Sequence, residues 1–90
     1  MKYKKGEIYT SYDSFNNSMW IWMCNINDWN CSYALYIKQD GTNSFYKNCG
    51  HGWKDSKLAT IREKKWILAC INANKLVSDP YKTNKIIELW

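Results

Sequence analysis

The sequence predicts an α+β fold in which a small antiparallel sheet of about five strands, curled toward a barrel or open, is packed by one C-terminal helix. Three observations lead to this prediction. Short apolar and aromatic segments alternate with turns rich in Asn, Asp, Ser and Gly over the first two thirds of the chain. A helix-capping pattern opens a single helical stretch after them. A length of 90 residues leaves room for one core, so residues 1–90 are expected to form a single domain.

The expected strands are residues 7–12, 18–27, 32–38 and 42–47, and the apolar tail at 85–90 is expected to be a last strand. Within the second of these, every position from 19 to 24 is apolar. A continuous apolar run of this length is typical of a central strand that is covered on both faces. Residues 18–27 are therefore expected in the middle of the sheet.

The turns suggest a strand register. Asp40-Gly41 is a two-residue hairpin signal, which would pair Tyr36 with Phe45. A similar turn at Asn27-Asp28 would place Cys24 opposite Cys31. On this register one face of the sheet would carry Trp20, Trp22, Cys24, Tyr33, Leu35, Ile37 and Tyr46. The other face would carry Met19, Ile21, Met23, Ala34, Tyr36, Phe45, Lys38 and Lys47.

The helix has recognisable ends. Thr60 and Glu63 have the spacing of a capping box, in which each side chain bonds the backbone N–H of the other residue. Asn74 is suited to a left-handed C-cap, so the helix is expected to end at about Ala73, and Pro80 prevents its continuation. Asn48 to Lys57 should form a loop before it.

A single helix can cover only one face of the sheet. We expect it on the face with the tryptophans. Met19, Ile21 and Met23 would then form an apolar patch on the other face, and a patch of this kind is rarely left exposed to water. Three outcomes remain open for this patch: the sheet curls around it, a second subunit covers it, or a ligand does. The prediction is that these residues form an interface and that the protein is a homo-oligomer.

The net charge of +5, from 13 Lys+Arg against 8 Asp+Glu, favours anionic partners such as a nucleotide, a nucleic acid or an acidic protein surface. Neither a signal peptide nor a membrane-spanning run is recognisable, which predicts a cytoplasmic protein with no membrane partner. In that reducing compartment the four Cys are expected to be free thiols.

Residues that could carry catalysis or bind metal do not form a standard pattern. Cys24, Cys31, Cys49 and His51 lack the paired spacing of structural zinc sites. A Cys24–Cys31 disulfide and a Cys49/His51 nucleophile pair are weaker alternatives. The carboxylates fall mostly at turns and caps, and no phosphate-binding glycine loop precedes the helix. We therefore expect no enzyme activity, no cofactor and no metal.

Aromatic residues interleaved with lysines suggest binding instead. Rings can stack on bases while ammonium groups contact phosphates. The candidate ligand-binding residues are Tyr36, Lys38, Phe45, Lys47, His51, Trp53 and Lys54.

The segment Leu58-Ala59-Thr60 … Glu63-Lys64 … Trp66 … Ala69-Cys70-Ile71 … Ala73-Asn74-Lys75 … Val77 resembles the closing helix of small uncharacterised bacteriophage proteins with a strand-rich N-terminal part. It departs from their pattern at Ile61-Arg62, where Pro-Glu is common. The resemblance implies an inhibitor of host defence that acts in the bacterial cytoplasm. Such a protein could sequester a nucleotide immune signal or occlude a host defence protein through the apolar sheet face. A nucleic-acid binder of low selectivity is a further alternative.

Overall fold

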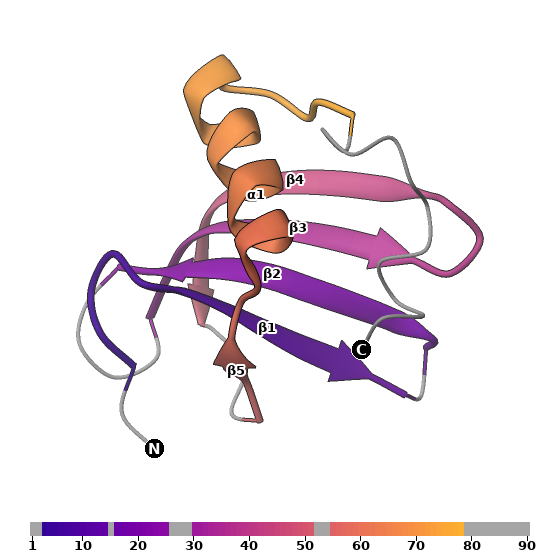
Figure 1. The fold of residues 1–90 in the computed structure, drawn as a ribbon, viewed down its shortest axis with the longest axis horizontal. Helices are drawn as coiled ribbons and strands as arrows, with labels where there is room; N and C mark the ends of the chain where they lie inside the picture. Colours follow the sequence, from indigo (N-terminus) through magenta and orange to yellow (C-terminus); the bar gives the residue numbers. More distant parts are fainter. Residues whose placement is uncertain (1–2, 15, 26–29, 52–54, 79–90) are drawn as a thin grey trace.

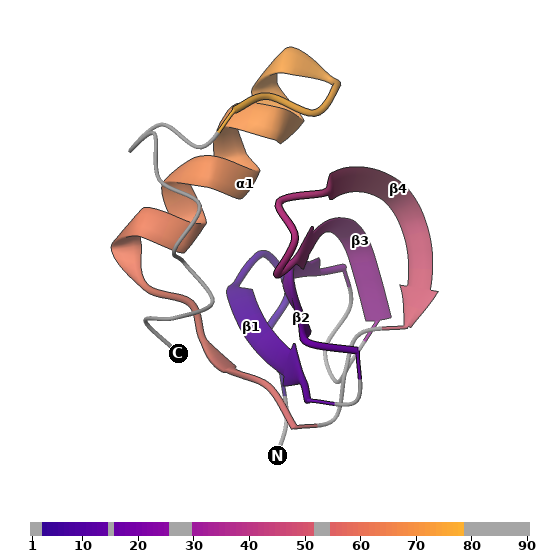
Figure 2. The same ribbon diagram turned by 90° about the vertical axis from the view of Figure 1, so that its right-hand side faces the viewer.

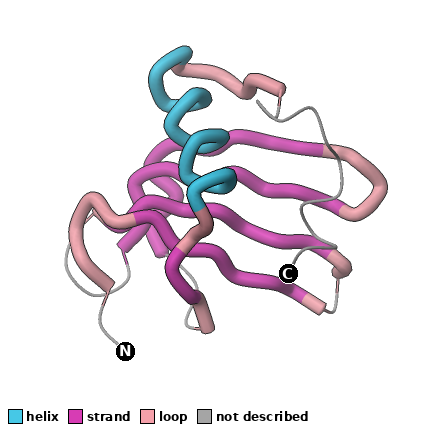
Figure 3. The backbone as a smooth tube through the Cα atoms, in the orientation of Figure 1, coloured by secondary structure: helices cyan, strands magenta, loops and turns pink. Residues whose placement is uncertain are grey.

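The computed structural model describes residues 3–14, 16–25, 30–51 and 55–78, and it confirms the predicted fold class. A five-stranded antiparallel sheet with the order β4-β3-β2-β1-β5 carries one helix, α1 (Figures 1 and 3). The elements are β1 (Ile8–Asp13), β2 (Ser18–Cys24), β3 (Asn30–Lys38), β4 (Asn43–His51), β5 (Lys57–Leu58) and α1 (Ile61–Ala73). The strand predicted at residues 85–90 lies outside the described residues, and β5 supplies the fifth strand.

Both predicted ends of the helix are confirmed. The Thr60 hydroxyl accepts a hydrogen bond from the Glu63 N–H, and the Glu63 carboxylate accepts one from the Thr60 N–H at 2.7 Å. Asn74 is the left-handed C-cap, with φ 59°. The Thr10 hydroxyl also donates to the buried Glu63 carboxylate, at 2.9 Å. The Glu63 carboxylate therefore links the start of α1 to β1. The capping box also provides hydrogen-bond partners at the helix N-terminus, where N–H groups lack partners within the helix.

The β3–β4 turn is one residue longer than predicted. The Lys38 N–H donates to the Thr42 carbonyl at 2.9 Å, so residues 39–41 form the loop, and Gly41 takes the positive φ, 94°, that such a loop requires. Leu35 therefore pairs with Phe45, and Ala34 pairs with Tyr46. The predicted pairing of Tyr36 with Phe45 is wrong because the Asp40-Gly41 signal does not fix the loop length.

The β2–β3 register contains a bulge. Cys24 does pair with Cys31, as predicted, but the register shifts between Met23 and Cys24, so that Ile21 pairs with Leu35. Because side chains alternate across a strand, a shift of one residue exchanges the faces of everything beyond it. The predicted alternation within each strand is correct, but the two strands are combined wrongly: Leu35 lies on the same face as Ile21, and Ala34 lies on the same face as Trp22.

The helix lies on the face that was predicted to be uncovered (Figure 2). We call this side of the sheet the helix face. Met19 and Ile21 have exposed fractions of 0% there, and Met23 packs at the edge of the same cluster. Trp66, Ile67 and Cys70 of α1 complete the core. Met19, Ile21 and Met23 thus do not form an exposed interface: the chain's own helix covers them.

The opposite side, which we call the far face, holds a second buried cluster. Its members are Tyr3, Tyr9, Trp22, Cys24, Cys31 and Ala34. The Trp22 indole N–H donates to the Ser56 hydroxyl at 2.9 Å, and the Ser56 N–H donates to the Tyr3 hydroxyl at 3.2 Å. The segments before β1 and before β5 therefore cover one end of the far face, while the strands curve around it without closing into a barrel (Figure 2). In the described residues, no helix is long and apolar enough to cross a membrane.

Candidate functional site

Three aromatic rings lie side by side on the far face, beyond its covered end. The Trp20 ring lies near both of the others, with its centroid 4.3 Å from that of Tyr36 and 5.8 Å from that of Tyr46. Trp20 and Tyr36 are half-buried, and Tyr46 has 44% of its surface exposed. We call these three residues the aromatic strip. Because its rings are held by one another and remain partly accessible, the strip offers a preformed apolar surface to a flat ligand.

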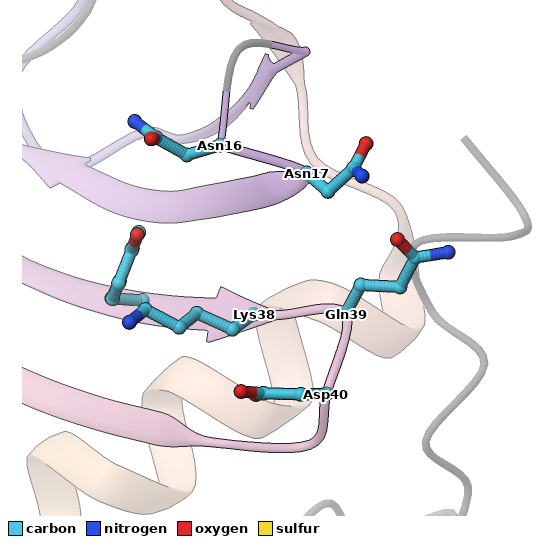
Figure 4. A pocket seen from close by; sticks show the side chains of 6 residues that line it. Asn16, Asn17, Lys38, Gln39 and Asp40 are labelled. Atoms are coloured by element: carbon cyan, nitrogen blue, oxygen red, sulfur yellow. The ribbon is translucent and has the colours of Figure 1, made fainter.

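A polar pocket adjoins the strip where the β1–β2 and β3–β4 turns meet (Figure 4). Its volume is about 590 Å³, and it is lined by Asn16, Asn17, Tyr36, Lys38, Gln39 and Asp40. The Gln39 N–H donates to the Asn17 carbonyl at 3.0 Å, which ties the two turns together. Tyr36 belongs to both the strip and the pocket, so a ligand in the pocket can contact a ring.

Local hydrogen bonds position the pocket side chains. The Tyr12 hydroxyl donates to Asn17 Oδ1 at 3.2 Å, and the Asn16 amide donates to Asp13 at 2.7 Å. Asn17 itself has φ 48°, a conformation that Asn tolerates better than most residues. Hydrogen bonds therefore hold the side-chain amides of Asn16 and Asn17 at the edge of the pocket.

The pocket combines one positive and one negative side chain. The Thr42 N–H donates to the Asp40 carboxylate at 2.9 Å, and this bond, together with the nearby Lys38, lowers the pKa of Asp40 below its ordinary value. Asp40 is therefore ionised at neutral pH, opposite in sign to the Lys38 ammonium. The remaining lining groups are neutral amides and a phenol, which both donate and accept hydrogen bonds.

The predicted binding residues do not come together as one site. Tyr36 and Lys38 line the pocket. Phe45 lies on the helix face and packs against the core, and Lys47 on the same face donates to the Asn74 side chain at 2.8 Å. The side chain of His51, and the residues Trp53 and Lys54, lie outside the described residues.

Sequence reasoning missed most of the site. Trp20 and Tyr46 join Tyr36 only on the register that the structure has. Asn16, Asn17 and Asp40 belong to predicted turns, Gln39 directly precedes one of them, and these turns meet at one end of the sheet. Two polar turns that flank the same pair of central strands were the available signal.

The cysteines differ from one another. Cys24 and Cys70 are free, buried thiols, as predicted, and burial raises the pKa of Cys70. Cys31 is disulfide-bonded, so the expectation that all four thiols are free is wrong. Because Cys24 is free, the alternative of a Cys24–Cys31 bridge is wrong as well. Among the residues described, no group of His, Cys, Asp and Glu is arranged to hold a metal ion.

No protein-family model matches the chain, and no curated protein or solved structure is similar to it.

Proposed function

We propose that this protein is a non-catalytic binding protein whose ligand is a nucleotide or nucleoside, held by the aromatic strip and the adjoining pocket. The observation that carries the proposal is the shared position of Tyr36, which belongs both to the strip with Trp20 and to the pocket with Lys38. A base would stack on Tyr36, the amides would bond its edge or the sugar, and Lys38 would contact a phosphate.

The charges of the pocket limit the ligand further. An ionised Asp40 beside Lys38 leaves little net positive charge in the pocket, so a polyphosphate would gain little net attraction there. The Asp40 carboxylate instead suits hydroxyl or amine donors, such as those of a ribose or a base. A ligand with one phosphate at the site, including a cyclic nucleotide, fits this balance best.

Replacing Tyr36 tests the stacking. We expect Tyr36→Leu to weaken binding of the best ligand in a panel of nucleosides, mononucleotides and cyclic nucleotides roughly 5- to 150-fold, because one stacked base contributes about 1–3 kcal/mol. Tyr36→Phe keeps the ring and should bind nearly as well. Calorimetry measures both. Equal binding by the leucine variant and the wild type, or no binding by any member of the panel, contradicts the proposal.

Replacing Lys38 tests the phosphate contact separately. Lys38→Gln should weaken binding of a nucleotide roughly 2- to 10-fold, the size of one hydrogen bond to an exposed cation, and leave the parent nucleoside unaffected. Lys47→Gln is the matched control, because it removes the same charge from the helix face. If Lys38→Gln weakens binding of the nucleoside as much as binding of its nucleotide, Lys38 supports the structure of the pocket and does not contact phosphate.

For the biological role, we propose that the protein withdraws a nucleotide signal from a bacterial defence pathway. This step rests on the resemblance of the segment from Leu58 to Val77 to phage proteins. An occluding role through Met19 and Ile21 loses support, since α1 covers both side chains. A bacterial strain with a cyclic-nucleotide defence separates the roles: protection of phage by the wild type but not by Tyr36→Leu supports sequestration.

A further inference from the structure

The strand β4 ends the sheet order, and half of its backbone groups point away from the sheet. The Lys38–Thr42 hydrogen bond makes that pair a hydrogen-bonded pair of the β3–β4 ladder. Such pairs alternate along an antiparallel ladder, so Ser44 and Tyr46 bond to β3. The N–H and C=O groups of Asn43, Phe45 and Lys47 therefore point outward, and no described strand pairs with them.

Only the first part of this edge is regular. The register with β3 shifts between Cys31 and Tyr33, and Asn48 and Gly50 have positive φ of 54° and 82°. A bulge of this kind twists an edge away from a partner strand. Residues 43–47 remain as an extended edge with three outward residues, and Phe45 is the middle one.

We propose that β4 pairs antiparallel with β4 of a second copy about a two-fold axis at Phe45, which joins two sheets into one. Phe45 would then face Phe45 of the second copy on the helix face. Ser44 would face Tyr46 on the far face, where the two aromatic strips become neighbours. The self-paired segment is residues 43–47 and ends where the bulge begins. It therefore uses the whole regular edge of β4.

The charges on the edge are compatible with a second copy in this register. Lys47 is the only charged residue from Asn43 to Gly50, and an edge lysine is a common defence against edge pairing. In the proposed register it faces Asn43 of the second copy and not another lysine. The pairing therefore places no like charges opposite each other, and each copy supplies both partners of every contact.

Substitutions at position 43 test the register. The wild type should show a dimer that dissociates with a constant on the order of 10–100 μM in sedimentation equilibrium. Asn43→Lys places two lysines opposite each other twice per dimer and should weaken it roughly 2- to 30-fold. Asn43→Lys combined with Lys47→Asn exchanges the two side chains and should restore the dimer. Failure of this exchange to restore it contradicts the register.

Amide exchange locates the contact without a substitution. As the protein concentration rises, exchange of the N–H groups of Asn43, Phe45 and Lys47 should slow, while Ser44 and Tyr46, already bonded to β3, should not change. A protein that stays monomeric over the whole range overturns the proposal. So does a dimer whose outward N–H groups exchange as fast as in the monomer, and so does protection of these groups only when another protein is added.

Discussion

Ile21→Ala is expected to lower the free energy of unfolding by about 2–5 kcal/mol, the usual cost of truncating a fully buried aliphatic side chain. Ile21 has an exposed fraction of 0% in the core between the sheet and α1. Removing its outer atoms leaves a cavity that neither a rigid sheet nor the helix can fill. Denaturation in urea, followed by tryptophan fluorescence, measures the change.

The chain contains a matched control for this substitution. Ile61 begins the same helix but has 73% of its surface exposed, so Ile61→Ala should change the free energy of unfolding by less than about 0.5 kcal/mol. If Ile21→Ala leaves too little folded protein, Ile21→Val should still cost about 0.5–1.5 kcal/mol. Wild-type stability in Ile21→Ala, accompanied by a change in oligomeric state, would mean that Ile21 lies at an interface and not under α1.

Local patterns predicted the elements of this fold well. The capping box of Thr60 and Glu63 involves only neighbours in sequence, and so does the left-handed Asn74, and both are present. The apolar run of β2 also predicted a central strand, which it is, with β1 and β3 on its two sides. Each of these features depends on a few consecutive residues, which is why sequence alone was enough.

The register could not be predicted in the same way. It depends on one extra residue in the turn at Gly41 and on one bulge next to Cys24. Neither changes the pattern of apolar and polar residues, yet each exchanges the faces of a strand. The error placed Leu35 and Ile37 on the face of the tryptophans, where the helix was then expected, so Met19 and Ile21 were predicted to form an interface. The same error separated Trp20 from Tyr36. The candidate site was missed for the same reason, because it exists only where the correct faces meet.

The disulfide at Cys31 is expected to contribute about 2–5 kcal/mol to the stability of the oxidised protein, the usual cost of losing such a bridge in a small domain. Cys31 lies in β3, next to the register shift that ends the regular pairing with the edge strand β4. A covalent bond at this residue restricts the unfolded chain. Adding a reductant should therefore lower the urea midpoint of the wild type.

Single substitutions identify which cysteine carries this effect. Cys31→Ala should abolish the response to reductant, whereas Cys24→Ala and Cys70→Ala should keep it, because both of these are free thiols. Loss of the response in Cys24→Ala would instead support a bridge between the paired residues Cys24 and Cys31.

Thiol labelling extends the test to the cell: the protein is taken from bacteria under acid quench, unfolded and then labelled. A reducing cytosol keeps thiols reduced. Labelling of Cys31 without reductant would therefore indicate that the protein is cytoplasmic and acts without this bridge. An unlabelled Cys31 would indicate that the protein acts in an oxidising environment.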